Sequence, residues 1–240
     1  STPPALPPLR RSCTTSSPPS TCTIPDRAGR TLALVGVDRA AGYYVVYGLD
    51  AKTSIFAAFT KHGTFLTSHG IVWRQIVFDM DSMLHTYATH DQMTSAMTTW
   101  TTTAGVGLQF TAPHAHWLNF MERNFRQLNL IANRNLLSRH LSELVWLDSL
   151  ISAADTINIF PVWNGDEHMR KGTSRNASFN FSPNPLHQLP FGALVCTAEP
   201  HRSHNQFRAN TRLGVVLRNP TASIMGWTVL RAEYPFKVTQ

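Results

Sequence analysis

The chain has 240 residues, enough for one large domain or for a main domain with a small second one. Its hydrophobic content of 42% is ordinary for a globular protein and argues against wholesale disorder. Lysine and arginine total 21 against 14 acidic residues, a formal net charge of +7 that favours polyanionic partners, nucleic acid first. From charge alone, a basic protein without a nucleic-acid role is an equally good interpretation.

The cysteines exclude several classes of site. Cys13, Cys22 and Cys196 form no C-x-x-C pair, which argues against a structural zinc site and against a disulfide framework. A reducing compartment, nuclear or cytoplasmic, is therefore expected. No apolar run is long enough to predict a transmembrane helix, so we expect no membrane partner. Because the first residue is Ser1 rather than Met, we also expect a fragment or a processed product.

The first half of the chain alternates strand and helix patterns. Residues 1–20 are rich in proline and serine and are interpreted as a linker or disordered arm. After them, apolar runs joined by a short glycine-containing turn predict a β-hairpin. The further predictions, in chain order, are a helix over 54–63 that ends at Gly63, a buried strand within 73–81, a helix over 91–105 that closes at Gly105, and a strand within 106–113.

A long helix follows, in the stretch "HWLNFMERNFRQLNLIANRNLL". Apolar residues recur there at steps of three and four, which predicts one buried face. They are Leu118, Met121, Phe125, Leu128 and Ala132. A polar face carries Glu122, Arg126, Asn129 and Asn133, and Glu122 is the only acid from His114 to Leu137.

The rest of the chain predicts a second helix and then a small β module. The helix is expected from Leu141 to Ile157 and stops before Pro161. Its inward residues are Leu144, Leu147, Ile151 and Ala154. Residues 162–186 are polar and are interpreted as a connection, and the short strand-like runs after Leu189 favour a small antiparallel barrel.

The order of these motifs resembles a known family. "VGVDRAAGYYVVY", "VFDMD", "QFTAP" and "MERNFRQL" together resemble the catalytic core of integrases from copia-type retrotransposons. In that family an Asp ends a strand in a phrase such as Met80–Asp81, and a Glu opens a helical phrase such as Met121–Leu128. The C-terminal runs resemble the small SH3-like domain that follows the core in copia-type polyproteins. The resemblance covers roughly residues 22–240.

The resemblance implies a fold and an activity. It implies an α/β core of ribonuclease-H-like type over 21–161, a mixed sheet flanked by helices, then a linker over 162–186 and an SH3-like β-barrel over 187–240. Such a core holds three carboxylates around two Mg²⁺ or Mn²⁺ ions, and two ions stabilise both oxygens of an in-line displacement at phosphorus. DNA is the implied partner, in end processing and strand transfer. A homo-oligomer is expected, and no small-molecule substrate.

Three acids are the candidate metal ligands. Asp81 is the candidate second ligand, with Asp79 on the same strand face as a competitor. Glu122 is the candidate third ligand, and its alternative is an ordinary i,i+4 pair with Arg126. The first ligand should lie on a strand at about Ser20–Pro25, where "STCTIP" contains no carboxylate. Asp26 is the nearest acid, although a turn aspartate is the better interpretation beside "RAG".

Two hypotheses follow. The first is a copia-type integrase core in which Arg123, Arg126, Asn129 and Arg134 bind DNA near the acids. The second is a catalytically dead protein of the same fold that binds nucleic acid or acts as a scaffold. The missing first acid makes enzymatic competence the point on which they differ.

Overall fold

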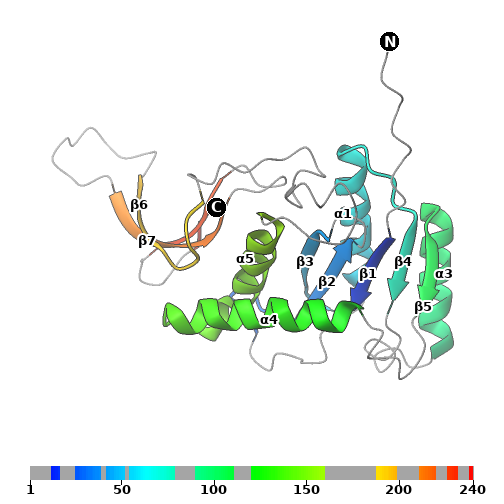
Figure 1. Ribbon diagram of the computed structural model, residues 1–240, viewed down its shortest axis with the longest axis horizontal. Coiled ribbons are helices and arrows are strands. Elements are labelled where there is room, and N and C mark those ends of the chain that lie inside the picture. Colours follow the sequence, from blue (N-terminus) through cyan, green and yellow to red (C-terminus); the bar gives the residue numbers. More distant parts are fainter. Residues whose placement is uncertain are drawn as a thin grey trace, which may run out of the picture.

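The computed structural model describes most of two β-sheets and the helices around them (Figure 1). The described residues are 12–16, 25–38, 42–51, 54–78, 90–110, 120–159, 188–198, 211–219, 226–231 and 238–239. The strands are β1 Ser12–Ser16, β2 Leu32–Asp38, β3 Tyr44–Leu49, β4 Gln75–Phe78, β5 Gly107–Phe110, β6 Leu194–Ala198, β7 Thr211–Arg218, β8 Thr228–Arg231 and β9 Val238–Thr239. The helices are α1 Ile55–Ser68, α3 His90–Ala104, α4 Phe120–Ser138, the 3-10 turn η4 Glu143–Val145 and α5 Trp146–Ile159.

The larger sheet is mixed. Its five strands lie in the order β3-β2-β1-β4-β5. β1 is antiparallel to β2, with Thr14 opposite Val37, and β2 is antiparallel to β3. β1 is parallel to β4, with Thr15 opposite Phe78, and β4 is parallel to β5. The predicted α/β class is therefore confirmed: a mixed sheet with helices beside it.

The position of β1 corrects the sequence analysis. The strand was expected at about Ser20–Pro25, but it lies at Ser12–Ser16, within the segment interpreted as a linker or disordered arm. Residues 21–24 lie outside the described part of the chain, and Asp26 belongs to the turn before β2. The strand is difficult to predict because prolines and serines flank "SCTTS" on both sides. Within the segment itself, only the two threonines favour a β-strand.

α1 and α3 cover one face of the sheet, and this face is aromatic. Phe59 and Met97 are almost fully buried, and Trp73 packs edge-on against Phe59 with ring centroids 6.0 Å apart. Trp100 contacts both rings. The predicted end of α1 at Gly63 is wrong: the helix continues to Ser68. Gly63 lies beside Trp73, and one glycine inside a helix costs only about 1 kcal/mol.

α4 and α5 cover the other face, which is mostly aliphatic. The expected inward residues Phe125, Leu128 and Ala132 are buried and pack against alternate residues of β2. The side chains of Leu118 and Met121 lie outside the described part. In the next helix Leu147 and Ala154 are buried as expected, whereas Leu144 is 48% exposed because it lies in η4, before the regular helix begins. α5 ends at Ile159, just before Pro161.

β6 to β9 form a second sheet, antiparallel and in sequence order. All four C-terminal runs contain strands as predicted, but over the described residues they do not close into the expected barrel. This sheet shares a small core with the helices: Leu217 of β7 and Phe191 pack with Val145. Figure 1 shows α5 between the two sheets, and α5 contacts β7. None of the helices in the described ranges has an apolar segment that could span a membrane.

Candidate nucleic-acid interface

The outer face of α4 carries the candidate nucleic-acid contacts. Arg123, Arg126 and Arg134 are exposed, and Asn129 is half-buried beside them. The inner face is anchored by the fully buried Leu128, so the orientation of α4 is set by its packing. α4 is a continuous helix along the side of the molecule, and it contacts β1 and β2 (Figure 1). Its arginines are thus presented to solvent from a rigid element.

Glu122 lies in the first turn of α4, where a negative charge is favoured by the helix dipole. Its Oε1 accepts a hydrogen bond from Nη2 of Arg126 at 3.3 Å. Both side chains are exposed, 47% for Glu122 and 81% for Arg126. This is the i,i+4 pair that the sequence analysis gave as the alternative to metal ligation, and an exposed pair of this kind contributes at most about 1 kcal/mol.

The candidate second ligand, Asp81, and its competitor Asp79 lie outside the described residues. β4 is described as far as Phe78, which is paired with Thr15 of the parallel strand β1. The carboxyl ends of β1 and β4 therefore meet at the same edge of the sheet. β1 reads "SCTTS" and brings no carboxylate to that edge.

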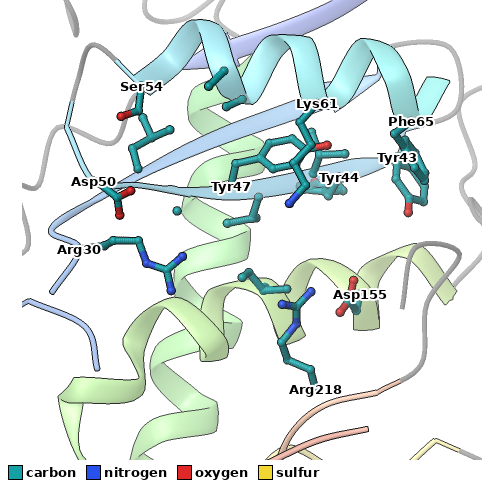
Figure 2. Close-up of a pocket in the computed structure, with 17 residues that line it drawn as sticks. Arg30, Tyr43, Tyr44, Tyr47, Asp50, Ser54, Lys61, Phe65, Asp155 and Arg218 are labelled. Atoms are coloured by element: carbon teal, nitrogen blue, oxygen red, sulfur yellow. The ribbon is translucent and has the colours of Figure 1, made fainter. Parts of the chain in front are cut away.

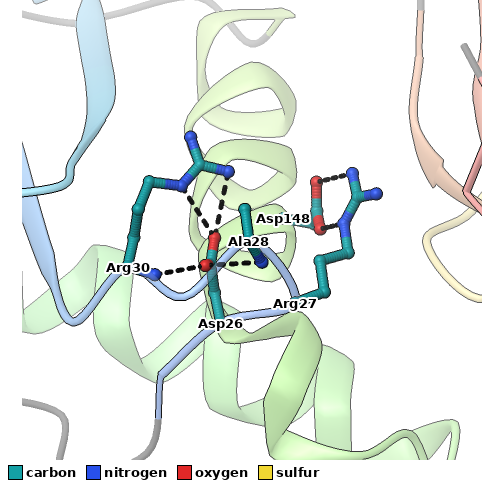
Figure 3. A network of polar contacts seen from close by, with 5 residues as sticks. All are labelled: Asp26, Arg27, Ala28, Arg30 and Asp148. Atoms are coloured by element: carbon teal, nitrogen blue, oxygen red, sulfur yellow. Dashed lines mark hydrogen bonds and ion pairs between the residues drawn. The ribbon is translucent and has the colours of Figure 1, made fainter.

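Asp26 is placed by a local network rather than on a strand (Figure 3). Its Oδ1 accepts hydrogen bonds from the backbone N–H of Ala28 at 2.9 Å and of Arg30 at 2.7 Å. Its Oδ2 accepts from Nε of Arg30 at 3.0 Å. Beside it, the Arg27 guanidinium forms a two-point ion pair with Asp148, with Nε and Oδ2 2.7 Å apart. Both oxygens of Asp26 serve a turn that is tied to α5.

The structure does not bring Asp26 and Glu122 together. The turn of Asp26 is fastened near the start of α5, since Arg27 N donates to the carbonyl of Leu144. α4 and α5 pack against each other, and α5 begins shortly after α4 ends. Glu122 is at the other end of α4, and the sixteen-residue rise to Ser138 corresponds to about 24 Å.

The described residues do not fit a three-acid metal centre. β1 offers no acid, Asp26 is fully engaged in its turn, and Glu122 is paired with Arg126. Within the described ranges, no group of three or more histidine, cysteine, aspartate or glutamate side chains is close enough to hold a metal ion. We therefore derive no catalytic step through Mg²⁺ or Mn²⁺.

Several buried polar groups were missed in the sequence analysis. Burial lowers the pKa of His62 to about 4, and its Nδ1 lies 3.1 Å from the Tyr47 hydroxyl. Burial raises the pKa of Asp155 to about 7, although the Arg218 charge acts to lower it. Asn158 bonds the backbone of Tyr44. Asp155 is the only charged residue in the stretch "LISAADTINI", and that is the signal in the sequence that could have identified it.

The chain was compared with known proteins. No protein-family model matches it, and no curated protein is significantly similar to it.

Proposed function

We propose that the chain is a nucleic-acid-binding protein of ribonuclease-H-like fold that resembles copia-type integrases but lacks a complete two-metal centre. It binds DNA through the outer face of α4. This is the second of the two hypotheses that the sequence raises, and the geometry of Asp26 and β1 favours it over the first.

The arrangement of the sheet supports the fold assignment. The resemblance implies a mixed sheet flanked by helices, and the larger sheet has five strands with helices on both faces. The C-terminal antiparallel strands lie where the resemblance implies the SH3-like module. Membership of either family remains a proposal.

The observation that carries DNA binding is the exposed arginine face of α4. Arg123, Arg126 and Arg134 point away from a fully buried inner face, and one acid offsets them. Arginine guanidinium groups bind phosphate oxygens through paired hydrogen bonds. The net charge of +7 adds a long-range attraction to a polyanion.

DNA binding is tested by its salt dependence. Each phosphate contact contributes roughly −0.9 to the slope of log K against log salt concentration. Arg134→Gln should reduce that slope by about 0.9 in magnitude, whereas Arg74→Gln removes an equal charge from an exposed loop before β4 and should leave the slope nearly unchanged. Equal effects of the two substitutions would refute the α4 interface and leave only a net-charge effect.

Catalysis is tested separately, with short DNA ends and added Mg²⁺ or Mn²⁺. The proposal predicts DNA binding that is the same with the metal or with a chelator, and no strand transfer. Strand transfer that requires metal and is abolished by Glu122→Gln would replace this proposal with the competent integrase. Glu122 in the first turn of α4 is the observation that favours that rival.

A further inference from the structure

β3 is an edge strand of the larger sheet, and part of its outer side is open. Hydrogen bonding in an antiparallel pair alternates, so successive residues of β3 direct their backbone groups toward β2 or away from it. The backbone groups of Tyr43 point toward β2, because its carbonyl accepts a hydrogen bond from Asp38 N at 2.9 Å. The backbone N–H and C=O groups of Tyr44, Val46 and Gly48 therefore point away from β2.

The outer side of Tyr44 is closed by a side chain. Asn158 of α5 accepts from Tyr44 N at 2.8 Å and donates to its carbonyl at 2.8 Å, so its amide replaces one peptide unit of a neighbouring strand. Val46 and Gly48 have no such partner among the described residues. The outward N–H and C=O groups of Val46 and Gly48 thus remain unpaired, next to the position that Asn158 covers.

A cavity of about 610 Å³ runs along this edge (Figure 2). It is lined by β3 from Tyr43 to Leu49, by α1 on one side and by α5 and Arg218 on the other. Cavities of 300–1,000 Å³ are typical of ligand sites. The open N–H and C=O groups of Val46 and Gly48 are therefore in a cavity large enough to hold a short extended chain.

Cations reach this cavity from three elements. Lys61 comes from α1, with its Nζ 5.8 Å from the centre of the Tyr47 ring, and Arg218 comes from β7. Arg30, from the turn before β2, lies against Gly48: an added Cβ there would be 2.9 Å from its Nη1. Asp50 and Asp155 are toward opposite ends of the same cavity in Figure 2. Because Arg30 is paired with Asp26, Lys61 and Arg218 are the cations of the groove that are available to a ligand.

Two buried groups at the groove lack hydrogen bonds. Oδ2 of Asp155 and Nε of Arg218 are buried and have no partner in the part of the chain that the structure describes. A buried polar group without a hydrogen-bond partner destabilises the folded chain. An acceptor and a donor thus remain unsatisfied beside the open strand edge.

We propose that the groove binds an extended acidic peptide segment, which adds to β3 as a further strand beside Val46 and Gly48. Its backbone supplies both the acceptors for the open N–H groups and the donors for the open carbonyls. Its carboxylates lie between Lys61 and Arg218.

Other occupants fit less well. A phosphodiester backbone carries acceptors but no donors, so it leaves the carbonyls of Val46 and Gly48 unpaired. A second copy of β3 would bring Lys61 of one chain toward Lys61 of the other, which is unfavourable. A partner peptide with acidic side chains satisfies both the backbone groups and the charges.

The test uses the whole chain and a fluorescent peptide of about six residues in which valine and glutamate alternate. Two control peptides replace glutamate by lysine or carry N-methyl groups on alternate amides. The proposal predicts that each control binds at least tenfold more weakly than the glutamate peptide. It also predicts that binding protects the Val46 and Gly48 amides from hydrogen exchange.

Two protein variants complete the experiment. Val46→Pro removes an outward N–H, a place where an edge strand tolerates proline, and should abolish binding with a native circular dichroism spectrum. Lys61→Glu should reverse the preference between the glutamate and lysine peptides. If Val46→Pro fails to fold, the N-methyl control on the wild-type chain decides.

Three results would overturn the proposal. They are absence of binding at millimolar glutamate peptide, equal binding of the N-methylated peptide, and a preference unchanged by Lys61→Glu. Arg134→Gln on α4 should leave peptide binding unaltered, so a failure of this proposal is distinguishable from a failure of DNA binding.

Discussion

The two faces of the larger sheet belong to the same strands, but different kinds of side chain pack against them. Alternate residues of β2 supply them: Leu34 faces α1, whereas Ala33 and Val35 face α4 and α5. The α1 face is filled by rings, among them Phe59 and Trp73. The other face is filled mostly by small and aliphatic side chains, with Tyr44 and Phe125 as its buried rings.

Two glycines, Gly48 and Gly63, differ in the space around them. On the face toward α5 a Cβ added at Gly48 would lie 2.5 Å from Cδ2 of Leu147, so the contact between Gly48 and this helix is tight. On the aromatic face a cavity of about 640 Å³ lies between α1 and α3, beside Trp73 and Trp100. Substitutions on the two faces should therefore differ in sign as well as in size.

The largest effect is expected from removing a ring. Phe59 is 1% exposed and contacts three other aromatic rings, so Phe59→Ala should lower the free energy of unfolding by about 3–5 kcal/mol. Urea denaturation measures it, with Val72→Ala at a 62% exposed position as the control. A loss below about 1 kcal/mol would mean that the aromatic face contributes little to stability.

The second largest effect is expected from removing the hydrogen bonds between Asn158 and the backbone of Tyr44. Asn158→Ala removes both hydrogen bonds between the Asn158 amide and the backbone of Tyr44, which should cost about 2–3 kcal/mol. Ser149→Ala removes a single buried hydrogen bond to the carbonyl of Ala132 and should cost about 1 kcal/mol. Equal losses of stability in the two variants would contradict the proposal that the Asn158 amide replaces a peptide unit of a neighbouring strand.

A matched pair of glycine substitutions compares the faces directly. Gly48→Ala should destabilise the chain by about 1–3 kcal/mol, since the added methyl group collides with Leu147 and Arg30. Gly63→Ala should stabilise it by up to about 1 kcal/mol, since the methyl group would lie 3.7 Å from Trp73 and alanine favours the helix. Thermal unfolding of both variants measures the two changes in stability. If both changes had the same sign, the proposed difference between the two faces would be wrong.

The smallest effect concerns pH. His62 has a pKa of about 4 in the folded chain, below the ordinary 6.5, so the unfolded chain binds the extra proton first and stability falls as pH drops through this window. The contribution of His62 to this loss should be about 1 kcal/mol between pH 6.5 and 5.5, measured as the difference between wild type and His62→Phe. Asp155 acts with the opposite sign, because its raised pKa of about 7 favours the folded state as pH falls toward 4. The difference between wild type and His62→Phe isolates the histidine, and parallel curves would contradict its assignment.

Much of this fold was predictable, because it rests on local patterns. The hairpin of β2 and β3, the closure of α3 at Gly105 and the inward face of α4 all follow from periodicity and turn residues. β1 was missed because its partners, not its composition, make it a strand. The pairing of Asn158 with Tyr44 spans 114 positions, and no local pattern reports it.

The candidate site was less predictable for the same reason. The interpretation of Asp26 as a turn residue agrees with its hydrogen bonds, whereas its distance from Glu122 depends on how α4 and α5 pack. The exposure of Arg123, Arg126 and Arg134 follows from the helical period. Their role in DNA binding stays a prediction.

The central place of β1 has a consequence for biosynthesis. The ribosome makes β1 first, but its parallel neighbour β4 emerges about sixty residues later. The β2–β3 hairpin can form early, since its contacts are local, while the middle of the sheet must wait for closure of a long loop. The nascent chain therefore carries an unfinished sheet for much of its synthesis, and a pause in translation before β4 would prolong the period in which it can aggregate.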